Sequence, residues 1–303
     1  MMTVAEAAAP ATTSRDAGAP KLRRRSVAWL GLTPFAIYVL LFLAIPAVLA
    51  VGSSFFDKEG TFTFANLSAF ADPHIQLDFF NSFWTSAVTA ILGAILGAIV
   101  CFALLTARPD GVLRTVIDSA SSVLAQFGGL MLAFAFIATI GIQGAITQAL
   151  VSLGAVDNPF SNGYLYSVPG LIIPYLYFQI PLMVLSFMPA MEGLKATWGE
   201  ANATLGGTRF TYWTRIAFPI LAPAFFGSLI LLFANSFSSY ATAAALIDQG
   251  GIVPLAIHQQ LSSETVVGAT NVAGVLALGM VIVMIVVMSV YSALQRRASR
   301  WQR

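Results

Sequence analysis

Charged residues are scarce in this chain, which has 303 residues of which 9% are Asp, Glu, Lys or Arg and 58% are hydrophobic. Globular domains carry about 25% charged residues, so the composition excludes an ordinary soluble domain. Apolar runs recur at lengths near the roughly 20 residues that a helix needs to cross a bilayer. We therefore predict an all-α, polytopic membrane protein.

Cysteine and histidine are nearly absent, with one cysteine, Cys101, and two histidines, His74 and His258. A lone cysteine forms no intrachain disulfide and offers no metal-binding spacing. The sequence also has no His-Glu-x-x-His helix motif and no Gly-x-Ser-x-Gly elbow. We expect neither a catalytic residue nor a metal site, and the chain is not predicted to be an enzyme.

Lysine is rare, and none of Lys21, Lys58 and Lys195 follows a glycine. The Gly-Lys-Ser/Thr loop that cradles nucleotide phosphates is therefore missing. Within the apolar runs the one acidic candidate is Asp118, whose place near the start of a predicted span suits a helix cap better than a proton relay. Without a nucleotide site or an ion-coupling residue, uphill transport requires energy from another subunit.

Six membrane spans are predicted, with boundaries near 27–53, 83–107, 117–142, 168–191, 218–247 and 272–294. The second span carries Gly93 and Gly97, a spacing that lets two helices approach closely inside lipid. Residues 1–26 are predicted to be a disordered basic tail, followed by one membrane domain over 27–303. We expect 143–167 to include a short helix along the outer surface.

Basic residues are distributed unequally between the two sides of the predicted topology. Lys and Arg near span ends stay on the cytoplasmic side, and 14 of the 15 basic residues fall on one side. These 14 are Arg15, Lys21, Arg23, Arg24, Arg25, Arg108, Arg114, Lys195, Arg209, Arg215, Arg296, Arg297, Arg300 and Arg303. Both termini are therefore predicted to be cytoplasmic, and the cations serve as topological anchors with no nucleic-acid partner implied.

The polar segment 200–219 is the region least suited to lipid. A short helix over 196–205 is expected to end where Gly206 and Gly207 permit positive φ. A second short helix from about Thr208 would lead to Pro219, which is tolerated in the first turn of the fifth span. The prediction is a stiff helix–turn–helix; the alternative is a generic amphipathic loop.

This segment resembles the cytoplasmic EAA loop of permease subunits in binding-protein-dependent ABC importers. That pattern runs Glu-Ala-Ala, then Asp-Gly-Ala, an aromatic residue, an Ile and a closing Leu-Pro. The chain matches it at Glu200, Ala201, Gly206, Ile216 and Pro219. It departs at Asn202 (Ala in the pattern), Leu205 (Asp), Gly207 (Ala), Trp213 (Phe) and Phe218 (Leu). The resemblance, with its span pattern, covers most of residues 80–295.

The resemblance implies the six-helix architecture of type I ABC importer permeases (MetI-like), in the bacterial plasma membrane. It implies as partners a second permease subunit, a dimer of ABC ATPases that binds the ATP, and an extracytoplasmic solute-binding protein, besides membrane lipid. No cofactor is expected on the chain itself. The loop over 194–219 would contact the ATPase, with contact residues Glu200, Ala201, Asn202, Gly206, Gly207, Thr208 and Arg209.

Polar side chains at helical spacing in the fourth and fifth spans are candidates for a solute path. They are Tyr175, Tyr177, Gln179, Asn235, Ser238, Ser239 and Thr242. Polar groups inside lipid face a neighbouring helix or a cavity, so hydrogen bonding between helices is an equally good interpretation.

The cargo is only weakly indicated. The sequence of the fifth span is most similar to spermidine/putrescine-type permeases, which suggests a polyamine, although similar permeases serve sugar, phosphonate or ferric cargo. Two alternatives lie outside the family: an ion-coupled secondary transporter and a membrane scaffold without transport.

Overall fold

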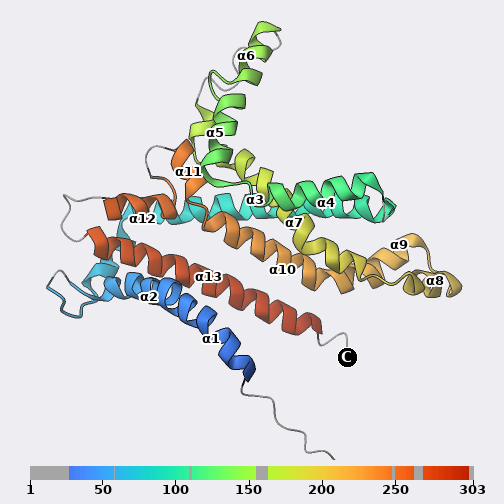
Figure 1. The fold of residues 1–303 in the computed structure, drawn as a ribbon, viewed down its shortest axis with the longest axis horizontal. Helices are drawn as coiled ribbons and strands as arrows, with labels where there is room; N and C mark the ends of the chain where they lie inside the picture. Colours follow the sequence, from blue (N-terminus) through green and yellow to red (C-terminus); the bar gives the residue numbers. More distant parts are fainter. Residues whose placement is uncertain are drawn as a thin grey trace, which may run out of the picture. The chain divides into compact units, whose positions relative to one another are not determined.

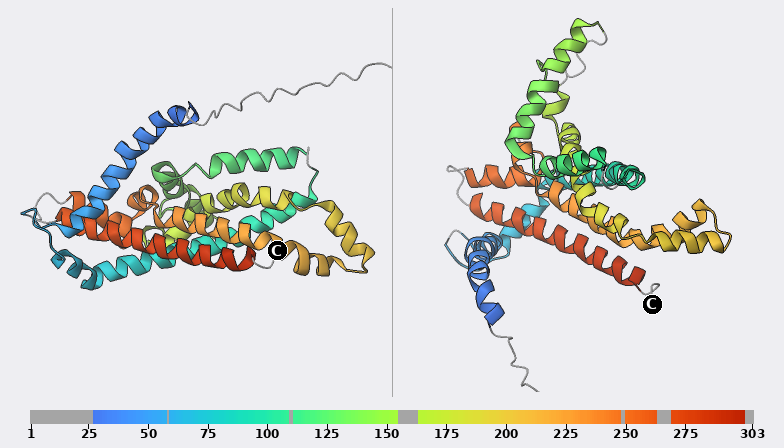
Figure 2. Two further views of the ribbon diagram at one scale, coloured as in Figure 1. Left: turned by 90° about the horizontal axis from the view of Figure 1, so that it is seen from below. Right: turned by 45° about the vertical axis from the view of Figure 1, so that its right-hand side comes forward.

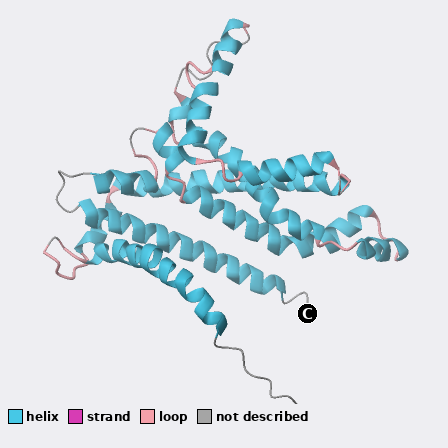
Figure 3. Cartoon of the chain, viewed as in Figure 1, coloured by secondary structure: helices cyan, strands magenta, loops and turns pink. Residues whose placement is uncertain are grey.

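The computed structural model describes residues 27–57, 59–108, 111–154, 163–247, 250–262 and 269–299. The predicted tail over 1–26 lies outside the described residues. Helices joined by loops make up this part of the chain (Figure 3), and within it extended pairing is limited to an isolated bridge between Phe56 and Phe62. The prediction of an all-α membrane protein is confirmed.

The chain divides into two units, residues 1–48 and 49–303. The first contains α1 (Val27–Val39), a π-helical turn (Leu40–Ala44) and the start of α2 (Ile45–Gly52). The second contains α3 (Pro73–Thr106), α4 (Val112–Leu124), α5 (Gly129–Ile140), α6 (Ala145–Ser152), α7 (Ile172–Glu192), α8 (Ala196–Thr204), α9 (Arg209–Tyr212), α10 (Phe218–Phe237), α11 (Ala241–Leu246), α12 (Val253–Ser262) and α13 (Ala269–Ser299).

Six helices among the described residues are long and apolar enough to cross a membrane, as predicted. They are Gly31–Phe55, Pro73–Thr106, Gly129–Ser152, Pro169–Glu192, Arg209–Phe237 and Thr270–Ala293. The second begins earlier than predicted because Asp72 caps it, its Oδ1 accepting a hydrogen bond from the backbone N–H of His74 at 2.8 Å, and Pro73 suits a first helical turn.

The predicted third span over 117–142 is wrong in its boundaries. Residues of its first half belong to α4, a separate helix of 13 residues. The chain leaves the helical path before Gly129, which has φ of 71°, a conformation that favours glycine. The long helix starts there and continues to Ser152, so α6 forms its end, with a break after Ile140. Asp118 lies inside α4 and pairs with Arg114 at 3.7 Å, so it does not cap a span.

The predicted fifth span over 218–247 is too long. The helix α10 ends at Phe237, where the Ser238 hydroxyl donates to the carbonyl of Ala234 at 3.0 Å. Serine hydroxyls that bond to the preceding turn compete with helix continuation. The chain then starts a new short helix, α11.

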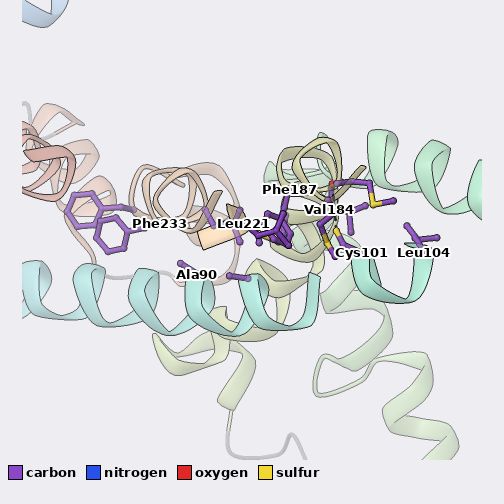
Figure 4. Packing of buried hydrophobic residues seen from close by; sticks show 13 residues of the cluster. Ala90, Cys101, Leu104, Val184, Phe187, Leu221 and Phe233 are labelled. Atoms are coloured by element: carbon purple, nitrogen blue, oxygen red, sulfur yellow. Dashed lines mark hydrogen bonds between the residues drawn. The ribbon is translucent and has the colours of Figure 1, made fainter. Parts of the chain in front are cut away.

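The main core lies where α3, α7 and α10 pack side by side (Figures 1 and 2). The predicted role of the glycine pair is confirmed: a Cβ on Gly93 would lie 2.8 Å from Gln179 Cβ, and one on Gly97 would lie 2.7 Å from Met183 Cγ. Figure 4 shows the same seam farther along, where Cys101 of α3 lies beside Val184 of α7. Glycine thus lets the two backbones approach more closely than a larger residue permits.

A second cluster gathers α5, α11 and the start of α7, with Leu132, Tyr175 and Leu246 in its interior. A third joins α3, α12 and α13 around Val253 and Leu276. The helix α4 packs along α7. Consequently α10, which carries Asn235 of the predicted path residues, packs against both α3 and α7.

Candidate functional site

The predicted coupling segment forms a helix–turn–helix at one end of the second unit, beyond the ends of α7 and α10 (Figure 1). Its first arm, α8, ends at Thr204; Leu205 is the C-cap, and Gly206 follows with φ of 75°. The Gly206 N–H donates to the carbonyl of Ala203 at 3.0 Å. The left-handed glycine satisfies a carbonyl of the last helical turn and reverses the chain, as the sequence predicts.

Asn202 stabilises this turn through two hydrogen bonds. Its side-chain Nδ2 donates to the backbone carbonyl of Thr208 at 3.1 Å, and its backbone carbonyl accepts a hydrogen bond from the Gly207 N–H at 2.8 Å. A Cβ on Gly207 would lie 2.6 Å from Asn202 Cγ. The two positions both depart from the EAA pattern, and the structure places them in contact: the larger side chain at 202 requires the smaller one at 207.

The second arm begins with a side-chain cap. Thr208 Oγ1 accepts a hydrogen bond from the backbone N–H of Thr211 at 3.2 Å, which satisfies one free donor of the first turn of α9. From Arg209 the chain stays helical to Phe237 through a π-helical turn, Trp213–Ala217. The sequence predicts a separate short helix here, whereas the structure shows one continuous helix that includes α10.

The continuous helix is also fixed to the core near its start. The Trp213 ring packs edge-on against Phe102 of α3, with ring centroids 5.2 Å apart. At the base of the loop, Arg114 of α4 forms an ion pair with Glu192 at the end of α7. These contacts connect both ends of the loop to helices of the core.

The outer surface of the loop is exposed and of mixed chemistry. Glu200, Ala201, Thr208 and Arg209 are exposed, whereas Asn202 and Gly207 are partly buried in the turn. Two large apolar side chains stand free at the tip: Leu205 is 88% exposed and Phe210 is 77% exposed. Exposed apolar groups beside charges are typical of a protein-binding surface. Leu205 replaces the Asp of the EAA pattern, so this surface is more apolar than the pattern implies.

Four of the predicted path residues meet in one depression of about 310 Å³. Its lining comes from two helix breaks that face each other, one between α4 and α5 and one between α10 and α11. Asn235, Ser238, Ser239 and Thr242 contribute from the second break, and Gln126, Gly128 and Gly129 from the first. The Thr242 hydroxyl accepts the Gly129 N–H at 3.0 Å and so holds the two breaks together. Discontinuous helices form part of the substrate sites of many secondary transporters.

The other three predicted path residues lie elsewhere. Gln179 is fully buried and donates through Nε2 to the carbonyl of Leu232 at 2.9 Å. Tyr175 is buried and its hydroxyl donates to the carbonyl of Ser239 at 3.0 Å. Tyr177 packs against the ring of Phe136 with centroids 5.9 Å apart. For Gln179 and Tyr175 the observed geometry is hydrogen bonding between helices.

Sequence reasoning missed the contribution of Gln126, Gly128 and Gly129 to the depression, because all three fall inside the continuous apolar run over 117–142. The Gly128-Gly129 pair, next to a polar Gln126, is the signal that indicates a break there.

No model of a known protein family matches the chain. Among curated proteins, the chain is similar to the sulfate transport system permease protein CysT of Synechocystis, with 23% identity over 79% of this chain and 81% of CysT. It is similar to the spermidine/putrescine transport system permease protein PotB of Haemophilus influenzae, with 21% identity over 84% and 89%. The probable ABC transporter permease protein y4fN of Sinorhizobium fredii shares 25% identity over 87% of this chain, which spans only 45% of y4fN.

Solved structures show the same fold. A chain of a bacterial alginate ABC transporter, crystallised with an alginate pentasaccharide-bound periplasmic protein, aligns with a TM-score of 0.69 at 15% identity, over 89% of this chain and 94% of that one. A chain of the MetNI methionine ABC transporter in an inward-facing conformation aligns with a TM-score of 0.52 at 14% identity, over 75% and 99%. The chain thus has the fold of ABC importer permeases and resembles binding-protein-dependent permeases in sequence.

Proposed function

We propose that the chain is the permease subunit of an ATP-driven importer and that α8 and α9 bind its cytoplasmic ATPase. The observation that carries this proposal is the construction of the loop. Its turn is closed by Asn202 and Gly206, its tip is exposed, and its second arm is continuous with α10. A displacement applied to such a rigid element reaches the membrane core without being absorbed in a flexible linker.

The proposed assembly contains a second permease, two ATPases that bind and hydrolyse ATP, and an extracytoplasmic solute-binding protein. This chain contributes no catalytic group. Both termini and the loop lie on the cytoplasmic side of a bacterial plasma membrane, in agreement with the distribution of basic residues. Similarity to permeases of the alginate and methionine ABC transporters supports this kind of assembly.

The depression between the two helix breaks is the proposed solute path on this subunit. Among the described residues its lining contains amides, hydroxyls, backbone groups and the Phe178 ring, with no acidic or basic side chain. Uncharged groups bind a passing solute weakly, so selectivity rests with the external receptor. The similar proteins are named for sulfate, for spermidine and putrescine, and for starch degradation products, so a polyamine is one of several cargo classes to be tested.

The substitution Glu200→Lys tests the coupling role. Glu200 is exposed on α8, so charge reversal leaves folding intact while placing a wrong charge in the proposed interface. We expect uptake to fall more than about tenfold, because mispaired charges at an interface cost several kcal/mol. The ATPase that copurifies with the tagged chain from its native membranes should be lost in parallel.

Glu59→Lys is the matched control, because Glu59 is an exposed acid in the loop before α3 and is predicted to lie on the other side of the membrane. It should retain both uptake and copurification. Normal uptake by Glu200→Lys at equal membrane abundance would contradict the coupling role. If the tagged wild-type chain purified from its native membranes without any ATPase, the proposed function would be wrong.

A further inference from the structure

A small interior space of about 10 Å³ lies between α3, the start of α7 and the end of α10. Five polar side chains line it, namely Ser82, Thr85, Ser86, Tyr175 and Ser236, and none of the five is more than 4% exposed. The remaining walls are apolar. A space of about 10 Å³ is at the lower limit of what accommodates one water molecule, so nothing larger fits.

The Thr85 hydroxyl makes this space chemically unusual. Its Oγ1 is buried and has no hydrogen-bond partner among the residues that the structure describes. A buried hydroxyl without a partner is destabilising, so most such groups are paired with protein or ordered water. The unpaired group lines this small space.

The neighbouring hydroxyl groups already make hydrogen bonds within the protein, and these bonds leave specific donors and acceptors available to a water molecule. Thr89 donates its single hydroxyl proton to the carbonyl of Thr85 at 2.8 Å, so Ser236, 2.9 Å from Thr89, is the donor of that pair and keeps a free lone pair. Tyr175 donates to the Ser239 carbonyl and likewise keeps a lone pair. Ser82 accepts from the Val253 N–H at 2.8 Å and keeps its proton.

We infer that this space is a binding site for one structural water molecule. The water would donate to Ser236 Oγ and Tyr175 Oη and accept from Ser82 and Thr85. Four partners of the correct sense meet the two to four that buried waters have. The lining contains no carboxylate, so it offers no charge to a cation. The water would join α3, α7 and α10 at one point, in addition to the direct Thr89–Ser236 bond between α3 and α10.

Thr85→Val tests this site through the sign of its effect on stability. If a water is bound, the substitution removes one of its partners, and the melting temperature of the intact protein in nanodiscs should fall by about 2–4 °C. Thr85→Ser, which keeps the hydroxyl, should stay close to wild type. If the space is dry, Thr85→Val removes an unpaired group, and the melting temperature should stay the same or rise. That result would overturn the proposal.

Hydroxyl-radical labelling with mass spectrometry provides a readout that does not depend on stability. Radicals formed from a bound water modify the side chains next to it. We expect severalfold more modification at Tyr175, 2% exposed, than at Phe187, a control 4% exposed in the main core. Thr85→Val should reduce it. Equal labelling of the two rings would contradict the site, and a melting temperature that depends on sodium at constant ionic strength would assign the space to a cation instead.

Discussion

The coupling loop and the α3–α7 seam are both close-packed arrangements that depend on glycine, but different contacts hold them. In the loop, Asn202 bonds to Thr208, six residues away in sequence. In the seam, Gly93 and Gly97 lie against Gln179 and Met183, more than 80 residues away. The loop is exposed and held by polar bonds, whereas the seam is buried and held by shape.

This difference determines what each region tolerates. An added methyl group on the exposed face of the loop meets water, and the loop keeps its hydrogen bonds. An added methyl group in the seam must displace a neighbouring helix, because interiors are packed as densely as organic crystals. The same substitution is therefore expected to have opposite effects in the two regions.

Gly97→Ala should have the largest effect. The new Cβ would lie 2.7 Å from Met183 Cγ, and overpacking of this kind typically costs about 1–3 kcal/mol. We expect a lower melting temperature of the purified protein and less protein in the membrane.

Gly199→Ala is the matched control. Gly199 lies inside α8 with no heavy atom within 4 Å of its Cβ position. Alanine there should stabilise the helix by about 0.5–1 kcal/mol, which slower amide hydrogen exchange in α8 would reveal. Equal destabilisation by both substitutions would contradict the proposed contrast.

The loop could be predicted from the sequence because its determinants are local. Gly206 reverses the chain by its own backbone conformation, and Thr208 caps a helix by bonding to an N–H three residues later. Pro219 suits the first turn of a helix whatever surrounds it. Its continuity with α10 is not predicted, because the sequence indicates a separate fifth span that begins at Phe218. A proline in the first turn of α10 instead follows a π-helical turn without ending the helix.

The span boundaries near the depression could not be predicted, because non-local contacts determine them. Hydropathy alone continues through Gly129, and the break depends partly on Thr242, which bonds to that glycine from 113 residues away. For the same reason the sequence could not separate Asn235, which lines the depression, from Gln179, which bonds to the carbonyl of Leu232 in the core.

Gly207→Ala should have an intermediate effect and should depend on Asn202. The new Cβ would collide with the Asn202 side chain, opening the turn and speeding amide exchange in α8. Asn202→Ala should relieve the collision, so that the double variant, which carries alanine at both positions as the EAA pattern does, is less perturbed than Gly207→Ala alone. Contacting residues give coupling energies of about 0.5–3 kcal/mol. Strictly additive effects would show that the two side chains do not compete for the same space.

Asn235→Leu should have the smallest effect, and it separates the depression from the core. Asn235 is exposed and lines the depression, so its replacement removes a solute contact without leaving a buried group unpaired. We expect uptake to fall by about threefold, or roughly 0.7 kcal/mol, with an unchanged melting temperature. Gln179→Leu should show the reverse, a lower melting temperature with uptake per folded molecule preserved, because it leaves the buried Leu232 carbonyl without its Gln179 donor. If Asn235→Leu instead destabilised the protein and preserved uptake, Asn235 would be a structural residue, and the depression would lose its place in the proposed path.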